Sequence, residues 1–270
     1  MNIFNTLIFD PLFNALIGLY NLLGDMGLAI IAITLVIRIL LLPLANKALR
    51  SQRRLQALQP ELKKLQDKHK DDREVMAKEL MAFYRREGVS PASSFLPLLI
   101  QIPILIALFF VFKDAVAGTH LDRLYDFVAR PENLDTRLLG LIDLSQKDII
   151  FLPAIAAGLQ FMQSRMLLPS GPDVPALQKQ LIFLFPVLTF VFATTLPAAL
   201  PLYWATTTLF TIVQQYVIIK EMPLATAKAE AAQEWNKANP QDKVKTPAKR
   251  LKRSTKQSKN ATVTVRKRGE

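Results

Sequence analysis

Apolar stretches long enough to cross a lipid bilayer recur along this chain, separated by polar segments. Five stretches reach or approach the roughly 17–25 residues that a membrane-spanning helix needs; they lie at 26–46, 94–113, 149–168, 180–196 and 201–219. Soluble domains rarely combine so much apolar sequence with a formal net charge of +12. Apolar spans that alternate with basic segments produce both features. We therefore predict an all-α polytopic membrane protein with five transmembrane helices.

The charges of the connecting segments predict how the chain is oriented. Residues 47–93 carry 12 lysine and arginine residues against 7 acidic ones, and residues 220–270 carry 14 against 5. The connection 113–148 carries 5 against 7. Because basic segments stay on the cytoplasmic side, the first two regions are predicted inside and the third outside. The N-terminus is then outside and the C-terminus in the cytoplasm.

Each connecting segment has its own predicted structure. Apolar residues at helical spacing in 1–25 predict an amphipathic helix lying on the outer membrane interface. Residues 47–93 predict a cytoplasmic helical hairpin with a polar turn at Lys68–Asp72. Residues 114–148 and 169–179 are an external and a cytoplasmic loop. The basic tail 220–270 has too little apolar content for a core and is predicted to be disordered.

An arginine interrupts the first span, in the sequence "LVIRILLLP". Burying such a charge costs at least roughly 2.5–3.5 kcal/mol, so Arg38 is expected to face a bundle interior or a wet cavity. No acidic residue lies in the central part of any span, so an ion pair is not expected. The alternative is that Arg38 reaches the inner headgroups by snorkelling. We favour a water-filled groove.

Other polar residues inside the spans are candidates for lining this groove. Thr34 lies four residues before Arg38 on the same helix face. The full candidate set, in addition to Arg38, is Thr34, Gln101, Gln160, Gln163, Trp204, Thr208, Thr211 and Gln215. Each of these could instead be an interhelical hydrogen-bonding residue, because Ser, Thr and Gln commonly connect membrane helices.

The chain has no cysteine, which excludes disulfides, thiolate metal sites and a cysteine nucleophile. The two histidines, His69 and His120, lie in polar stretches and offer little basis for a metal site. We expect no metal, no cofactor and no enzymatic activity.

Four motifs, in consistent order over about Leu28 to Lys220, resemble the core of YidC-type membrane protein insertases, which include the mitochondrial and chloroplast members. The motifs are "ITLVIRILLLPL", "LQPELKKLQDKHKDDREVMAKELMAFYRREGVSP", "FLPLLIQIPILIALFFVF" and "LYWATTTLFTIVQQY". The resemblance implies a short five-span form around a hydrophilic groove that is open to cytoplasm and lipid. It matches Arg38 to the groove arginine of the family, and Thr34 and Trp204 to groove residues that meet the nascent chain. The match of Gln160 is less secure, because the third span is variable there.

The function expected from the resemblance is insertion and folding of nascent membrane proteins in a bacterial plasma membrane. Expected partners are nascent membrane proteins and membrane lipids, with no DNA. The basic tail could approach ribosomal RNA or anionic headgroups, and action with a Sec-type translocon stays open. A transporter or anion channel with Arg38 as its selectivity charge is the main alternative. A membrane tether, in which Arg38 is dispensable, is a further one.

Overall fold

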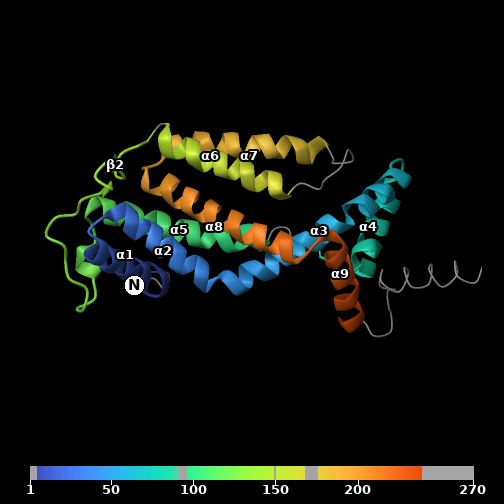
Figure 1. Ribbon diagram of the computed structural model, residues 1–270, viewed down its shortest axis with the longest axis horizontal. Helices are drawn as coiled ribbons and strands as arrows, with labels where there is room; N and C mark the ends of the chain where they lie inside the picture. Colours follow the sequence, from blue (N-terminus) through green and yellow to red (C-terminus); the bar gives the residue numbers. More distant parts are fainter. Residues whose placement is uncertain (1–4, 88, 91–95, 149, 168–175, 239–270) are drawn as a thin grey trace, which may run out of the picture. The chain divides into compact units, whose positions relative to one another are not determined.

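The computed structural model describes residues 5–87, 89–90, 96–148, 150–167 and 176–238, and these residues are mostly helical (Figure 1). They divide into two compact units, which we describe separately. The first contains residues 1–49 and 95–220, and the second contains 50–94 and 221–270. The helical fold class predicted from the sequence is confirmed.

The first unit begins with the π-helix η1 (Asn5–Phe9) and continues directly into α1 (Asp10–Leu23). One side of α1 is fully buried, with Phe13, Leu16 and Ile17 in the main hydrophobic core. This side packs against α2 (Met26–Leu40) and α5 (Leu96–Ala117). The amphipathic pattern therefore has an intramolecular explanation, and the interfacial position of this helix stays a prediction.

A tight corner joins α1 to α2. Gly24 closes α1 in the left-handed conformation, with φ of 69°, which glycine adopts without steric cost. Asp25 then caps α2, because its Oδ1 accepts the backbone N–H of Leu28 at 2.8 Å.

The first predicted span is not one straight helix. α2 ends at Leu40 and α3 (Leu42–Lys68) begins two residues later, with 67° between the two axes. Pro43 explains the break, since proline has no N–H to donate and disfavours helical geometry at the residue before it. Arg38 consequently lies in the last turn of α2, and not near the middle of a helix that runs over 26–46.

The connection after α5 is folded onto the ends of α1 and α2. It contains the short helix η3 (Leu121–Arg123) and an antiparallel pair of two-residue strands, β1 (Arg137–Leu138) and β2 (Ile142–Asp143). Leu138 lies directly over Gly27 of α2, where a Cβ atom would come within 3 Å of its side chain. A glycine is therefore required for this close approach.

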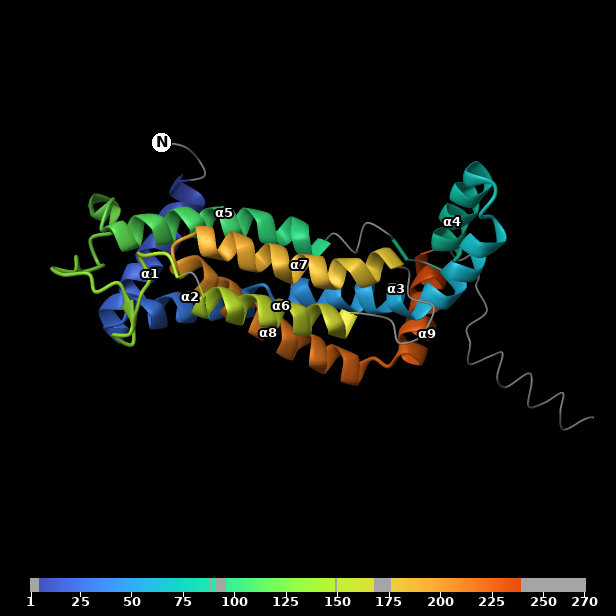
Figure 2. The ribbon, with the colours of Figure 1, turned by 90° about the horizontal axis from the view of Figure 1, so that it is seen from above.

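Three further helices complete the first unit: α6 (Phe151–Leu167), α7 (Ala176–Thr195) and α8 (Ala199–Glu221). Figures 1 and 2 show α6 and α7 side by side as an antiparallel pair. The turn between α7 and α8 is short and hydrogen-bonds to the preceding loop, with the N–H of Ala198 donating to the carbonyl of Gln146 at 2.8 Å. The predicted loop 169–179 falls largely on residues outside the described ranges.

The second unit contains the rest of α3, then α4 (Arg73–Glu87) and α9 (Leu224–Ala238). The predicted hairpin is present, with its turn at residues 69–72, although α3 starts at Leu42 and runs through Pro60. The prediction of disorder over 220–270 is wrong for its first part. Alanine-rich sequence has high helix propensity, and Ala227, Ala231 and Ala232 of α9 are buried. Residues 239–270 lie outside the described ranges.

Only some of the described helices are both long enough and apolar enough to be counted as membrane spans. By length and composition, the helical stretch Asn5–Leu23 qualifies by itself, and the bent pair α2–α3 qualifies together. A signal sequence or a buried core helix can satisfy the same test, so five spans remain a prediction. However, large apolar side chains are exposed along several helices, for example Leu40, Phe183 and Val213. Such an extensive apolar exterior is typical of a surface that contacts lipid or protein.

Candidate functional site

The candidate site is a polar cluster that three helices of the first unit build around Arg38. Arg38 comes from the last turn of α2, Gln101 from α5, and Tyr203 and Thr207 from α8. Tyr203 and Thr207 are four residues apart, so they lie on one face of α8 and point the same way. The three helices thus bring together residues that are more than 60 positions apart in sequence.

A chain of hydrogen bonds connects these four side chains. The Nε of Arg38 donates to the hydroxyl oxygen of Thr207 at 2.9 Å, and its Nη2 donates to the amide oxygen of Gln101 at 2.7 Å. The amide nitrogen of Gln101 donates in turn to the hydroxyl oxygen of Tyr203 at 2.5 Å. Tyr203 is almost fully buried and packs edge-on against Phe112 of α5. The cluster therefore fixes the guanidinium between α5 and α8.

The cluster holds a positive charge without neutralising it. Within the part of the chain that the structure describes, no carboxylate forms an ion pair with Arg38. A guanidinium carries five N–H donors, and the two contacts just described occupy only two of them. Arg38 is half-buried, and its guanidinium also interacts with the hydroxyl of Tyr203.

The structure joins one of the predicted groove residues, Gln101, directly to Arg38. Thr34 does not line an open surface, because it is buried and its hydroxyl donates to the carbonyl of Ile30 in its own helix at 2.6 Å. Gln160 and Gln163 are half-buried on α6. Among the described residues, no hydrogen bond connects either glutamine to the Arg38 cluster.

The candidate groove residues on α8 divide into two groups. Thr208 and Gln215 are buried, and the hydroxyl of Thr211 donates to the carbonyl of Thr207 at 2.8 Å. Trp204 is only half-buried. Of the predicted residues on α8, Trp204 and Thr211 are therefore the ones that keep side-chain surface exposed.

Sequence reasoning missed the residues of α8 that hold Arg38. Tyr203 and Thr207 lie one position before the chosen Trp204 and Thr208, which is a rotation of about 100° around the helix. Gln214, one position before the predicted Gln215, lies on the same face of α8 as Tyr203 and Thr207. Its side-chain amide nitrogen donates to the amide oxygen of Asn46 at 2.7 Å. A buried tyrosine hydroxyl usually requires a polar partner, but the sequence alone does not show that Tyr203 is buried.

The comparisons with known proteins bear directly on this site. The sequence model of the family described as 60Kd inner membrane protein matches residues 18–227. The chain belongs to this family. The match covers the whole Arg38 cluster, and the predicted resemblance to YidC-type insertases is confirmed.

Individual relatives are named as YidC membrane protein insertases. The chain is 34% identical over 221 residues to "Membrane protein insertase YidC" of Pelagibacter ubique, covering 80% of this chain and 39% of that protein. It is 36% identical over 202 residues to the proteins of that name from Francisella philomiragia subsp. philomiragia and Francisella tularensis subsp. novicida. That alignment covers 75% of this chain and 34% of each relative. The chain thus spans only about a third to two fifths of the length of these relatives.

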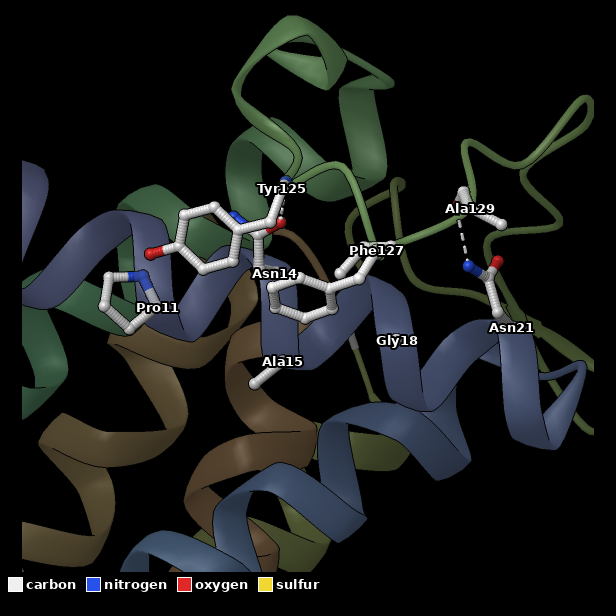
Figure 3. Close-up of a pocket in the computed structure, with 9 residues that line it drawn as sticks. Pro11, Asn14, Ala15, Gly18, Asn21, Tyr125, Phe127 and Ala129 are labelled. Carbon is white, nitrogen blue, oxygen red and sulfur yellow. Dashed lines mark hydrogen bonds between the residues drawn. The ribbon is translucent and has the colours of Figure 1, made fainter.

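A separate cavity of about 540 Å³ lies between α1 and the loop after α5 (Figure 3). Two asparagines of α1 bind this loop. The side-chain oxygen of Asn14 accepts the N–H of Tyr125, and the side-chain nitrogen of Asn21 donates to the carbonyl of Ala129. The family match begins at residue 18, so Asn14 lies before it and Asn21 within it. This cavity includes no residue of the Arg38 cluster and is not part of the candidate site.

Proposed function

We propose that this chain is a membrane protein insertase that inserts nascent membrane proteins and helps them to fold. The observation that supports this most strongly is the Arg38 cluster, a cation held by neutral acceptors inside an apolar helical unit. It occurs in a chain whose relatives are named as insertases. The activity requires no covalent chemistry, since it lowers the barrier to moving a polypeptide into lipid.

The physical problem in insertion is the transfer of polar substrate segments through hydrocarbon. Each unsatisfied polar group costs several kcal/mol there. In our proposal a hydrated groove beside Arg38 shortens that passage, and the remaining N–H donors of Arg38 attract acidic residues of the incoming chain. The attraction is strengthened where the surrounding dielectric is low.

We assign the groove to a bundle of five transmembrane helices with the N-terminus outside and the C-terminus in the cytoplasm. Of the predicted groove residues, Trp204, Thr211, Gln160 and Gln163 are the ones that keep exposed surface for substrate contact. The buried Thr34, Thr208 and Gln215 would shape the wall instead. The apolar surface of α7 and α8, exemplified by Phe183 and Val213, suits release of an apolar substrate segment into lipid.

The partners follow from the charge distribution and remain part of the proposal. The basic residues of 220–270 would be attracted by the phosphates of ribosomal RNA or of anionic headgroups. Cooperation with a Sec-type translocon is compatible with the same site. The transporter or anion-channel alternative is not favoured, because the relatives described above are named as insertases.

Site-specific photo-crosslinking tests the proposal. A photoreactive residue replaces Trp204, which is half-buried, and the full chain in proteoliposomes receives a ribosome-bound, single-span substrate. We expect an adduct between the protein and the nascent chain. The same photoreactive residue at Leu22, which is exposed on α1, serves as the control and should give much less adduct. Absence of an adduct at position 204 in folded protein, or equal adducts at both positions, would contradict the proposal.

A further inference from the structure

A second cavity, of about 360 Å³, lies where the end of α5 meets the turn between α7 and α8. Its walls are mainly apolar and include Phe109, Phe112 and Val116 of α5, and Leu196 and Leu200 from the α7–α8 region. Its volume falls within the range of about 300–1,000 Å³ that is usual for small-molecule sites. Arg38 and its hydrogen-bonding partners do not line it.

The walls of this cavity are held in place by backbone hydrogen bonds. The loop before α6 pairs with the α7–α8 turn, because Lys147 and Pro197 form a β-bridge. The N–H of Ala199 also donates to the carbonyl of Leu144 at 3.2 Å. On the α5 side, Phe112 is fully buried and packs against Tyr203 of α8. The cavity is therefore a built feature between fixed segments.

One cation, Lys113, forms part of the cavity wall. Its side chain is exposed, and among the described residues no carboxylate forms an ion pair with it. Two acidic residues close to the cavity lining in sequence have other partners. Asp114 pairs with His120 at 3.2 Å, and Asp143 accepts hydrogen bonds from Ser145, which also lines the cavity, and from Thr136.

The position of the cavity suggests what would occupy it. α5 is apolar for most of its length and exposes Ile102, Ile106 and Phe110, so a lipid chain beside it meets a continuous apolar surface. Lys113 follows that surface at the end of the helix near the polar loop. A lysine at such a boundary places its ammonium group at the level of lipid headgroups.

We propose that this cavity binds an anionic phospholipid from the leaflet that lies on the side of the 118–148 loop. The phosphate pairs with the ammonium group of Lys113, and part of an acyl chain enters the apolar space between Phe109 and Leu200. The bound lipid would brace the α7–α8 turn against α5. The inference depends on the membrane location of the chain and not on insertase activity.

Cross-linking to a photoactivatable phosphatidylglycerol tests this proposal. The full chain is reconstituted in phosphatidylcholine vesicles with a few per cent of the probe, and the labelled peptides are mapped by mass spectrometry. We expect labelling within 109–117 and 196–200. Lys113→Gln should reduce it about fivefold, since the attraction of one lysine for anionic headgroups contributes roughly that factor. Lys113→Arg should retain it, and Lys220→Gln, at another exposed lysine, should leave it unchanged.

A second variant separates loss of charge from loss of space. Ala117→Phe fills the cavity without changing any charge, and labelling of both peptides should fall while that of other peptides stays constant. Equal labelling by a phosphatidylcholine probe would overturn the proposal, as would unchanged labelling in Lys113→Gln.

Discussion

At the scale of single residues, Arg38 is a half-buried cation whose hydrogen-bond partners are neutral acceptors. A carboxylate partner would satisfy the guanidinium of Arg38 but would also cancel its field. The amide oxygen of Gln101 and the hydroxyl of Thr207 fix its position and leave its charge intact. In the proposed function, an incoming carboxylate would gain a charged hydrogen bond, which contributes about 1.5–3 kcal/mol in proteins.

The first prediction concerns the charge of Arg38. We expect Arg38→Lys to keep part of the insertion activity, because an ammonium preserves the charge but cannot donate to Gln101 and Thr207 in the same fork. Arg38→Glu should abolish insertion of a substrate with an acidic N-terminal tail. The measurement is the protease-protected fraction of that substrate in proteoliposomes, with a neutral-tail substrate as control. Equal activity of the lysine and glutamate variants would show that the charge is not used.

The second prediction concerns Gln101, which bridges Arg38 and Tyr203. Gln101→Leu removes the acceptor for Arg38 and the donor to Tyr203. It should lower the free energy of unfolding in detergent by about 1–3 kcal/mol. Tyr203→Phe should cost about 0.6 kcal/mol, a usual value between membrane helices. It should cost almost nothing once Gln101 is leucine. Tyr216→Phe, at an exposed tyrosine of α8, is the neutral control. Additive losses would mean that the two residues are not coupled.

Arg38 and Gln101 could be identified from the sequence because each interrupts a long apolar run. Tyr203 and Thr207 could not, because the rotation of α8 about its own axis is set by packing against α5. The sequence of α8 offers polar residues on more than one face, and helical spacing alone does not choose among them. Thr34 is on the expected helix, but its hydroxyl satisfies a carbonyl of that helix and not the groove.

At the scale of elements, α6 begins with a carboxylate cap. The side chain of Asp148 accepts the backbone N–H groups of Ile150, Phe151 and Leu152 at 2.7–3.0 Å. Partial burial raises the pKa of Asp148, but these three hydrogen bonds outweigh it and the net pKa is lowered. The stabilisation is therefore complete above the ordinary carboxyl pKa of about 3.9 and is lost as the pH falls through the lower folded-state value.

The third prediction follows from this cap. Asp148→Ala should destabilise α6 by about 1 kcal/mol at neutral pH, as is usual for the loss of an N-cap. The effect should disappear as the pH falls through the lowered pKa of Asp148, where the carboxyl group becomes protonated in the wild type. Hydrogen exchange of the first turn of α6 measures it. Asp126→Ala, in the exposed loop, is the matched control. If Asp126→Ala changed the exchange of α6 equally, the loss of a negative charge, and not the loss of the cap, would be responsible.

The fourth prediction concerns α9, which ion pairs attach to α3. Lys228 pairs with Glu61, and Glu230 pairs with Arg54 at 3.4 Å. Glu61→Lys should increase amide exchange in α9 up to about fivefold, because partly exposed pairs contribute about 0.2–1 kcal/mol. The double variant Glu61→Lys with Lys228→Glu should restore protection. Glu74→Lys breaks a more exposed pair within α4 and should not affect α9. If the reversed pair failed to restore protection, this ion pair would not hold the helix.

The presence of a helix could be predicted from the sequence where a long apolar run or an amphipathic pattern marks it, as for α5 and the α3–α4 hairpin. The bend at Leu41 and the helix α9 could not. The bend depends on one proline within an otherwise apolar run. α9 has too few large apolar residues to be recognised, and its small buried side chains become informative only when α3 and α4 supply a surface for them.

At the scale of the whole molecule, the distribution of charge and apolar surface leads to the last prediction. Residues 47–93 and 220–270 are basic and 113–148 is slightly acidic, so the two kinds of segment should lie on opposite sides of the membrane. Because the chain has no cysteine, single cysteines can report this directly. We expect Met81→Cys to react with an impermeant maleimide only in inside-out vesicles, and Leu141→Cys only in intact spheroplasts. Both positions are exposed, so lack of reaction cannot come from burial. Labelling of both cysteines from one side would rule out an odd number of membrane crossings between the loops, and with it the five-helix arrangement.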